Sequence, residues 1–358
     1  MKHIKALDGI RFLAVTLVLM EHWLDTEIKF AVGYSGVCVF FVLSGFLITN
    51  ILLKAKVADN EANRNHGRSL KLFYIRRTIR IFPVYYLLIL IAFLLNEPSV
   101  HTYFWWIFTY TSNIYIASHQ TWMGVVDHFW SLAVEEQFYL FFPCVVFFVP
   151  LKYLPKTLIF LSIIAVLLRL YFYMTGYLWM TSYVLMPTCL DAFSLGGLMA
   201  YFFKFKNKTF VTFFKNRIGL VISLLVYVLS QIYIFQFNHN HGFLSVVLMR
   251  CFESILAVYL IGNAIIGLPI YSKILLHPVS LYLGKISYGI YIFHNFIYNH
   301  YHASASHPMT IFFKNYPFFD EHIYIKFFFL YGITIAFASI SWFLIEKPIN
   351  KLKDKFEY

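Results

Sequence analysis

The stretch Val32–Leu53, VGYSGVCVFFVLSGFLITNILL, runs for 22 residues without a charged side chain. An α-helix needs about 20 mainly apolar residues to cross the ~30 Å hydrocarbon core of a bilayer, so this stretch predicts a membrane-spanning helix. The whole chain of 358 residues has the same character, with 60% hydrophobic and 13% charged residues. Soluble domains carry about 25% charged residues. The composition therefore predicts an all-α fold, a polytopic integral membrane helical bundle.

Apolar segments of this kind recur along the chain, separated by short polar loops. They predict ten membrane-spanning helices in a single membrane-embedded domain that covers residues 1–358, with the first and ninth spans short. The aromatic stretch Tyr103–Tyr115 is expected at the membrane–water interface, where Trp and Tyr are enriched, and Lys54–Lys71 is expected to be a polar loop. The ten predicted spans are Ile10–Trp23, Val32–Leu53, Ile79–Leu95, Phe129–Val149, Thr157–Tyr173, Tyr183–Phe203, Ile218–Phe237, Phe243–Ile266, Ser287–Tyr301 and Tyr324–Ile345.

Positive charge is unevenly distributed between the loops. The net charge is +12, and most of the 29 Lys and Arg residues fall in alternate loops, whereas the long segment Asn96–Asp127 contains none. Cytoplasmic loops of membrane proteins are rich in Lys and Arg, so an even number of spans with both termini cytoplasmic is predicted. Because the basic residues lie in short loops between apolar runs, the charge does not indicate binding to nucleic acid.

Ionisable residues inside the predicted spans are candidates for function, because inserting each one costs about 2.5–3.5 kcal/mol. Arg11 and His22 stand eleven residues apart in the first span. That spacing is about three helical turns, so the two residues share a face and are separated by ~16 Å. Arg11 then lies near the cytoplasmic side and His22 toward the outer side. Alternatively, Arg11 reaches the interface with its long side chain, and His22 only caps the outer end of the helix.

Two adjacent carboxylates, Glu135 and Glu136, follow in DHFWSLAVEEQFY, near the outer end of the fourth span. Exposing both carboxylates to lipid would cost a large free energy, so one of them is expected to face a polar interior at the depth of His22. A His–Glu pair suits general base catalysis, since the carboxylate fixes the tautomer of the imidazole and stabilises its protonated form. The alternative is that both carboxylates lie at the water interface.

Basic residues enter the third span in the stretch RRTIRIFP, with Arg76, Arg77 and Arg80 at its inner side. Arg77 and Arg80 are three residues apart and share a helix face, and planar guanidinium groups suit phosphate recognition. The alternative is simple anchoring of the span at the cytoplasmic surface. Weaker candidates inside other spans are Ser287, Tyr288 and His294 in the ninth, Asp191 in the sixth, and Arg250 and Glu253, placed to pair, in the eighth.

Histidines and cysteines do not predict a metal site. The histidines outside the spans stand in aromatic loops that define no ligand geometry, and the four cysteines lie inside apolar segments without a C-x-x-C pair. Buried, inert thiols are expected. The histidines in question are His239, His241, His300, His302 and His307.

Six motifs in order give the chain a close resemblance to the acyltransferase family 3 of membrane O-acyltransferases, over essentially its whole length. The first span contains R-x10-H at Arg11 and His22, and the second contains G-V-x-x-F-F-x-L-S-G-F-L. The other four are R-x-x-R-I-x-P at Arg77–Pro83, W-S-L-x-V-E at Trp130–Glu135, I-S-Y-x-x-Y-x-x-H at Ile286–His294, and Glu346–Pro348 at the end of the last span. The chain resembles a stand-alone member without the C-terminal esterase-like domain that some members carry.

The resemblance implies an enzyme of a bacterial inner (cytoplasmic) membrane. Its reaction would transfer an acetyl or other short acyl group from a cytoplasmic acyl-CoA to a hydroxyl of an extracytoplasmic glycan, such as lipopolysaccharide O-antigen or exopolysaccharide. Acetyl-CoA would be a substrate, and no bound cofactor is expected. A small-molecule acceptor of the macrolide kind stays open, as does a polysaccharide transporter or flippase. Inverted repeats and paired broken helices, which are typical of transporters, are not detected.

The resemblance also implies roles for individual residues. His22 is expected to act as the base on the acceptor hydroxyl, with Glu135 orienting it. Arg77 and Arg80, with Arg76 and Arg11, are expected to hold the phosphates of the acyl-CoA. Ser287 and Tyr288 are candidates for stabilising the oxyanion. Direct transfer and a covalent acyl-enzyme both stay open.

Overall fold

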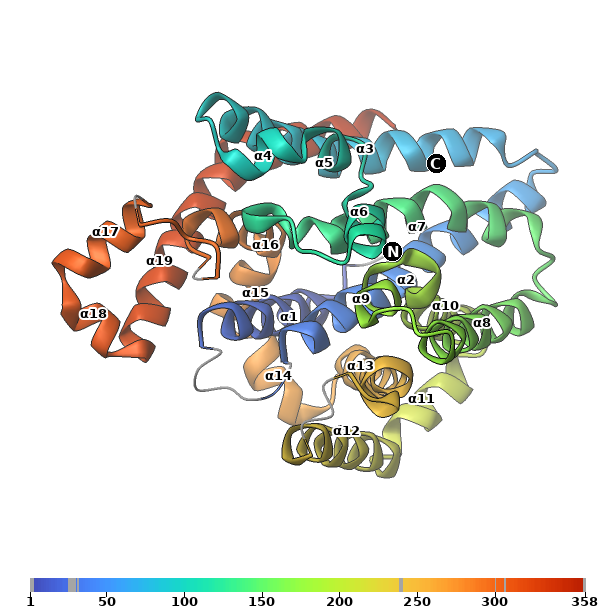
Figure 1. Ribbon diagram of the computed structural model, residues 1–358. Coiled ribbons are helices and arrows are strands. Elements are labelled where there is room, and N and C mark those ends of the chain that lie inside the picture. The colour runs from blue at the N-terminus through green and yellow to red at the C-terminus, as the bar shows by residue number, and fades with distance from the viewer. Residues whose placement is uncertain are drawn as a thin grey trace.

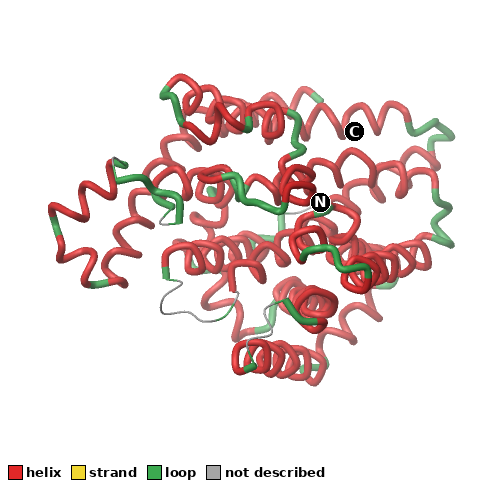
Figure 2. The backbone as a smooth tube through the Cα atoms, viewed as in Figure 1, coloured by secondary structure: helices red, strands yellow, loops and turns green. Residues whose placement is uncertain are grey.

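The computed structural model describes residues 3–24, 30, 32–237, 241–299, 301–305 and 307–356. Every regular element in these ranges is helical (Figures 1 and 2), so the predicted all-α class is confirmed. The helices pack around one continuous apolar core that involves elements from both ends of the chain.

The first half of the chain contains long helices joined by short ones. Its elements are α1 (Ala6–Trp23), α2 (Val32–Glu61), α3 (Gly67–Leu94), α4 (Pro98–Thr102), α5 (Phe104–Phe108), α6 (Ser112–His119), η1 (Gly124–Val126), α7 (Phe129–Phe148), α8 (Leu154–Met174), α9 (Trp179–Val184) and η2 (Met186–Cys189).

The second half continues with helices of more varied length. Its elements are α10 (Leu190–Phe205), α11 (Asn207–Lys215), α12 (Ile218–Gln236), η3 (Leu244–Leu248), α13 (Met249–Ile266), α14 (Pro269–Leu275), α15 (Pro278–Lys285), α16 (Ser287–Ile297), α17 (Pro308–Asn315), α18 (Pro317–Glu321), α19 (Ile323–Ser341), η4 (Trp342–Glu346), α20 (Lys347–Asn350) and η5 (Lys351–Lys355).

Seven helices in the described part of the chain are long and apolar enough to cross a membrane. They agree with seven of the ten predicted spans, and the chain is a multi-pass membrane protein. Helix α2 runs on to Glu61 and α3 begins at Gly67, so most of the segment expected as a polar loop, Lys54–Lys71, is helical instead. The seven are α2, α3, α7, α8, α12, the continuous helix Leu244–Ile266 and the continuous helix Ile323–Lys355.

The three other predicted spans do not form long apolar helices, and the count of ten is not confirmed. Helix α1 carries Asp8, Arg11 and Glu21 within its 18 residues. The predicted sixth span is divided, because the chain leaves helix α9 at Leu185 and resumes in α10 only at Leu190. Helix α16 has 11 residues, which gives a length of about 16 Å and too short a helix to span alone. The cytoplasmic placement of both termini stays a prediction.

Helices α1, α2 and α10 lie at the centre of the bundle, with α12 at one edge and α17–α19 at another (Figure 1). Glycines allow these central helices to cross closely. A Cβ at Gly45 of α2 would overlap the carbonyl oxygen of Phe193 in α10, and a Cβ at Gly196 would overlap the carbonyl oxygen of Val42. The glycine of the S-G-F-L motif is therefore required for backbone-to-backbone packing, as at small-residue crossings of membrane helices.

Replacing Gly45 by alanine is expected to destabilise the fold by about 1–3 kcal/mol, because the added methyl group has no room against a rigid backbone. Thermal unfolding of the purified protein in detergent measures this loss. Gly332 of α19 provides the matched control, since a Cβ there has no neighbour within 4 Å. Equal stability of Gly45→Ala and Gly332→Ala would show that α2 and α10 can separate without cost.

A buried ion pair fastens α8 to α10. The guanidinium Nη2 of Arg169 lies 2.7 Å from Oδ2 of Asp191, and both side chains are almost fully buried. Arg169 also donates to the carbonyl oxygens of Thr188 and Val247. Asp191, a weaker candidate for function from the sequence, is thus part of a hydrogen-bonded structural junction between α8, α10 and η3.

Candidate active site

A cavity of about 790 Å³ opens among the N-terminal part of α1, α2, α3, α7, α15, α16 and the C-terminal helices. We call it the basic cavity, because Lys and Arg side chains outnumber carboxylates in its wall. It brings together most of the site residues predicted from the sequence. Those in its wall are Arg11, Arg77, Arg80, Glu135, Ser287 and Tyr288, joined by Lys5, Lys285, Lys353, Asp8, Glu136 and Glu346.

The arginines of this region differ in their partners. Arg11 forms an ion pair with Asp8 at 2.6 Å, so its charge is already balanced. Arg77 and Arg80 form no ion pair with a carboxylate among the described residues, and Arg77 lies over the ring of Tyr139 with its guanidinium carbon 3.6 Å from the ring centroid. Two guanidinium groups without a carboxylate partner in a cavity wall form a site suited to anions.

Arg76 lies elsewhere. Its Nη1 donates to the carbonyl oxygens of Lys353 and Phe356, at 2.9 and 2.6 Å. It therefore holds the C-terminal turn η5 against α3, and it is not among the residues that line the basic cavity. The structure brings Arg77 and Arg80 together with Arg11 but directs Arg76 to the chain end.

Glu135 is held by α2 and by its own helix. Its Oε1 accepts a hydrogen bond from Ser44 Oγ at 2.9 Å, and its Oε2 accepts one from Tyr139 at 2.7 Å. Tyr139 also donates toward Ser44 Oγ at 3.0 Å. No hydrogen bond joins Glu135 and His22 among the described residues, since Glu135 lines the basic cavity whereas His22 packs against His294.

The wall opposite Glu135 comes from α16. Ser287 is buried there, and the hydroxyl of Tyr288 donates to the carbonyl oxygen of Ile81 at 3.0 Å. Tyr288 is thus tied to α3 and has already used its hydrogen. At the deep end of the cavity, Ser131 and Tyr291 share a hydrogen bond, and this pair separates the cavity from a group of histidines.

Three imidazole rings pack together beyond Tyr291, and we call them the histidine cluster: His22, His128 and His294. The ring centroid of His294 lies 4.9 Å from that of His22 and 4.9 Å from that of His128, edge to face in both cases. His294 is fully buried. The sequence placed His22 and His294 on separate spans, and the fold makes them neighbours.

The hydrogen bonds distinguish the rings of the cluster. His128 accepts at Nδ1 from Asn295 at 3.0 Å and donates from Nε2 to the carbonyl oxygen of Ile292 at 3.3 Å, so both of its nitrogens are used. His294 donates from Nδ1 to the carbonyl oxygen of Tyr291 at 2.6 Å. Its Nε2 has no hydrogen-bond partner among the described residues. A neutral imidazole donates through one nitrogen and accepts through the other, so Nε2 of His294 is a buried acceptor with an unused lone pair.

Asp127 supports the histidine cluster through Asn295. The Oδ1 atom of Asp127 accepts a hydrogen bond from the side-chain amide of Asn295 at 2.9 Å, and this bond orients the amide toward His128. Its Oδ2 lies 3.4 Å from Nε2 of His302 in the following loop. The Asp127 carboxylate raises the pKa of His302 above its usual value by accepting this hydrogen bond, so the protonated form of His302 is favoured.

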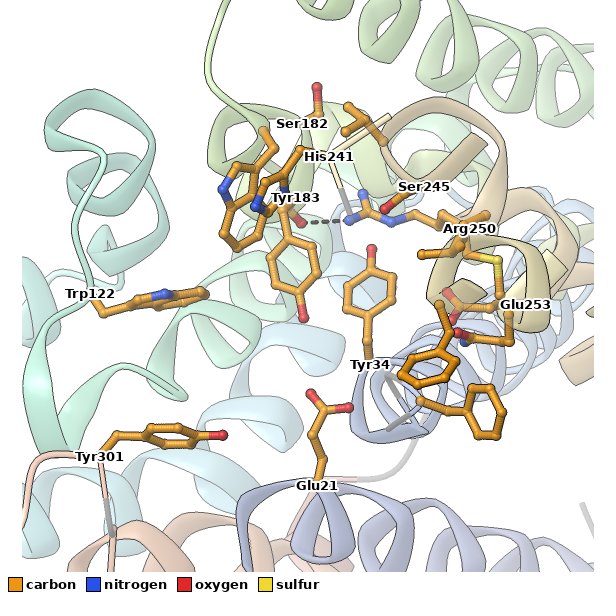
Figure 3. Close-up of a pocket in the computed structure, with 17 residues that line it drawn as sticks. Glu21, Tyr34, Trp122, Ser182, Tyr183, His241, Ser245, Arg250, Glu253 and Tyr301 are labelled. Atoms are coloured by element: carbon orange, nitrogen blue, oxygen red, sulfur yellow. Dashed lines mark hydrogen bonds between the residues drawn. The ribbon is translucent and has the colours of Figure 1, made fainter. Parts of the chain in front are cut away.

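A second cavity, of about 510 Å³, lies near the other end of α1. We call it the aromatic cavity, since aromatic rings form much of its wall (Figure 3). The Glu21 carboxylate, the Tyr301 ring and the Trp122 indole border the same space in that view. Its other lining residues include Tyr34, Trp179, Tyr183, Gln231, His241, Arg250 and Glu253.

The two cavities lie along the same two helices. Arg11 of α1 lines the basic cavity and Glu21 lines the aromatic cavity, and ten residues of helix separate them by about 15 Å. On α2 the cavities come much closer, because Tyr34 lines the aromatic cavity and Val37 the basic one. Three residues of helix rise by about 4.5 Å, so the cavities end within one helical turn of each other.

No group of three or more His, Cys, Asp or Glu side chains able to hold a metal occurs among the residues that the structure describes. His241, His302 and His307 fall in this part of the chain, whereas His239 and His300 lie outside the described residues. In the histidine cluster, His128 and His294 donate hydrogen bonds to the carbonyl oxygens of Ile292 and Tyr291.

The sequence model of one family, described as the acyltransferase domain Acyl_transf_3, matches residues 4–346. The chain belongs to this acyltransferase family. No solved structure gives a significant match to it.

Three relatives of this chain are bacterial proteins named as O-acetyltransferases. A Staphylococcus aureus (strain COL) protein, provisionally named an O-acetyltransferase, is 29% identical over 98% of this chain and 58% of its own length. The peptidoglycan O-acetyltransferase OatA of Listeria monocytogenes is 30% identical over 82% of this chain and 49% of its own. The O-acetyltransferase OatA of Staphylococcus aureus (strain NCTC 8325) is 26% identical over 98% and 58%. The chain thus spans about half to three-fifths of the length of these relatives.

Several residues of the candidate site escape prediction from the sequence. Ser44 and Tyr139, the partners of Glu135, carried a signal, since Ser44 stands in the S-G-F-L motif and Tyr139 follows Glu135 by one helical turn. His128 was visible beside Asp127, but nothing in the sequence placed it next to His294. The aromatic cavity had only a partial signal, in the ionisable residues Arg250 and Glu253 of the eighth predicted span, because its walls come from segments scattered from Glu21 to Tyr301.

Proposed function

We propose that this chain is a membrane O-acyltransferase that moves an acetyl or other short acyl group from a cytoplasmic acyl-CoA to a hydroxyl of an extracytoplasmic glycan. The observation that carries the proposal is the pair of cavities that end within one helical turn of each other beside the histidine cluster. In the proposed orientation, which follows the Lys and Arg bias, the basic cavity faces the cytoplasm and the aromatic cavity faces outward.

The basic cavity suits an acyl-CoA. Arg77 and Arg80, which lack carboxylate partners among the described residues, would hold its phosphates by charge-assisted hydrogen bonds. Lys5 and Lys353 add positive charge to the same wall. The thin pantetheine arm would then extend along α2 toward Ser131 and Tyr291, which places the thioester next to the histidine cluster. Arg11, already paired with Asp8, would contribute mainly through its charge.

The reaction forms two bonds, C–O and S–H, and breaks two, O–H and C–S. The acceptor hydroxyl oxygen attacks the thioester carbonyl carbon, a C–O ester bond forms, and the C–S bond to CoA breaks. His22 accepts the hydroxyl proton as general base, and that proton finally resides on the CoA thiol. The ring centroids of His22 and His294 lie 4.9 Å apart. His294, whose Nε2 lone pair is unused, would share the proton with His22.

For Glu135 we propose a role that differs from the one expected from the sequence. Its hydrogen bonds with Ser44 and Tyr139 fix the ring of Tyr139, and that ring supports the guanidinium of Arg77. A guanidinium stacked on an aromatic face is held in one orientation. Glu135 would therefore position the donor-binding Arg77 rather than the base.

The acceptor is proposed as a hydroxyl of a surface glycan. Peptidoglycan is the acceptor in the name of the Listeria relative, and lipopolysaccharide O-antigen or exopolysaccharide are the alternatives from the family resemblance. Proton NMR of surface polysaccharide and of digested peptidoglycan, from cells that express the chain or carry an empty vector, tests the proposal. An O-acetyl signal that depends on the chain identifies the acceptor, and its absence from every glycan fraction would refute transfer to a glycan.

Replacing Arg80 by alanine is expected to raise KM for acetyl-CoA by about 10- to 100-fold, because hydrogen bonds to charged groups contribute about 1.5–3 kcal/mol each. Arg77→Ala should behave alike, and kcat should change less than KM in both. CoA release by the purified protein in nanodiscs is the readout. Arg68→Ala, an exposed arginine on the same helix outside the cavity, is the control. An unchanged KM for acetyl-CoA in both variants would show that the acyl donor does not bind in this cavity.

A further inference from the structure

We infer that the aromatic cavity is the acceptor site of the transferase and that it binds an uncharged pyranose residue of the glycan. The inference rests on the proposed function for its place in the reaction. It goes further in naming the residues that recognise the acceptor and the class of sugar that fits them.

Buried polar atoms in the cavity wall lack partners. The hydroxyl of Tyr34 and Nε of Arg250 have no hydrogen-bond partner among the described residues, although these side chains belong to residues only 7% and 4% exposed. Buried polar groups in proteins are nearly always hydrogen-bonded, because leaving one unpaired costs about 1–3 kcal/mol. Two such atoms in the wall of one cavity indicate a ligand that carries several hydroxyl groups.

The rest of the Arg250 guanidinium is firmly held. It donates to the carbonyl oxygen of Thr188 at 2.8 Å. It also donates to the carbonyl oxygen of Tyr183 at 2.5 Å, as Figure 3 shows. The expected ion pair with Glu253 is not formed among the described residues. Arg250 is thus held in place as a residue of the cavity wall whose Nε has no partner among the described residues, and its guanidinium carbon lies 5.0 Å from the centroid of the Tyr34 ring.

Aromatic rings meet at varied angles around this polar wall. The ring centroid of Tyr183 lies 4.3 Å from that of Tyr34 and 5.4 Å from that of Trp179. Trp122 stands perpendicular to Tyr183 at 6.2 Å. The carbon-bound hydrogens on the face of a pyranose pack against such rings, while the hydroxyl groups at its edge reach polar atoms. A mainly aromatic cavity with a few placed polar groups has the composition of a specific ligand site.

The charges in the wall exclude acidic sugars. Glu21 and Glu253 both line the cavity, against the single guanidinium of Arg250. Glu253 keeps its place by accepting hydrogen bonds from Ser35 at 2.8 Å and from Cys38 at 3.3 Å. Carboxylates accept hydrogen bonds from sugar hydroxyls but repel uronates and phosphates. An uncharged hexose or N-acetylated hexosamine therefore fits this wall, and a uronic acid does not.

The position of the cavity suits an acceptor site. Glu21 of its wall is the residue immediately before His22 in α1. Tyr34 of its wall stands three residues before Val37 of the basic cavity. A sugar held between Glu21 and Tyr34 would present a hydroxyl toward the histidine cluster and toward the deep end of the donor cavity.

Saturation-transfer NMR on the full chain in nanodiscs tests the inference without requiring turnover. The probes are methyl pyranosides of glucose, galactose, rhamnose and N-acetylglucosamine, with methyl glucuronide as the acidic counterpart. At least one neutral probe is expected to bind, and the glucuronide at least about tenfold more weakly, which corresponds to ~1.4 kcal/mol. Tyr34→Phe should weaken neutral binding by roughly fivefold through loss of one hydrogen bond, and Trp179→Ala should weaken it at least as much.

Matched controls separate local from general effects. Tyr74→Phe removes a hydroxyl that is bonded to Leu140, and Trp105→Ala removes a 71% exposed indole. Neither residue lines either cavity, so both variants should bind like wild type. Absence of neutral-sugar binding, or tighter binding of the glucuronide, would overturn the inference. Sugar binding without CoA release would uphold this site and refute the transfer reaction, so the two proposals fail separately.

Discussion

Replacing His22 by alanine is expected to lower the rate of acyl transfer by about 10²- to 10⁴-fold, the usual contribution of a general base. His22 stands between the aromatic cavity, through Glu21, and the other two imidazoles of the histidine cluster. His128 has both nitrogens engaged in hydrogen bonds. The choice of base therefore falls on His22 and His294.

The companion variant His294→Ala decides between these two. Loss of rate in both variants, with KM for acetyl-CoA unchanged, would mean that the imidazoles act together on one proton. A much larger loss in His294→Ala would assign the base to the Nε2 of His294 and leave His22 as its neighbour.

The measurement is CoA release and ester formation by purified protein in nanodiscs across a range of pH. His119→Ala is the control, because His119 is an exposed histidine outside both cavities. Retained transfer by both His22→Ala and His294→Ala, at unchanged protein yield, would contradict base catalysis by the histidine cluster.

Replacing Arg169 by methionine is expected to destabilise the protein by about 3–5 kcal/mol, because it leaves the carboxylate of Asp191 buried and unpaired. This residue lines neither cavity, so the loss should appear in stability rather than in KM. Thermal unfolding followed by tryptophan fluorescence, in detergent, gives the size of the effect.

The double variant Arg169→Met with Asp191→Leu tests the cause of that loss. Removing both charges together leaves no unpaired carboxylate, so most of the stability should return. A double variant as unstable as the single one would show that the hydrogen bonds from Arg169 to Thr188 and Val247 matter more than its ion pair. Stability of Arg169→Met equal to wild type would contradict the whole account.

The long apolar helices could be predicted from the sequence, and the short ones could not. Helix α2 and the helix Ile323–Lys355 are read directly from uninterrupted hydrophobic residues. The segment Tyr183–Phe203 is equally apolar, yet it contains a break before Leu190. Pro187 stands in this break, where proline disfavours a continuous helix, and Arg169 and Arg250 both donate to the carbonyl oxygen of Thr188. Hydropathy registers the apolar surface but neither of these features.

The candidate site was predictable where its residues act through charge. Arg77 and Arg80 reach a cavity, as their shared helix face indicated. Arg76, one residue earlier, points to the carbonyl oxygens of the C-terminal turn, which a helix-face argument alone does not determine. Glu135 and His22 were matched by depth in the membrane, but depth says nothing of lateral position, and Ser44 and Tyr139 take both oxygens of Glu135. The variants described above test the roles proposed for Arg77, Arg80 and His22.

The thin wall between the two cavities, one turn of α2 from Tyr34 to Val37, has an electrical consequence. With water entering from both sides in the proposed orientation, the membrane potential falls mainly across that wall instead of across ~30 Å of hydrocarbon. The hydroxyl proton moves inward to the thiol as the acyl group moves outward to the hydroxyl oxygen. The hydroxyl, thioester, ester and thiol are all uncharged at the reacting atoms, so no net charge crosses the wall. The transfer is therefore expected to proceed at the same equilibrium whatever the membrane potential, although a charge moved alone through that field would be worth about 2.3 kcal/mol per 100 mV.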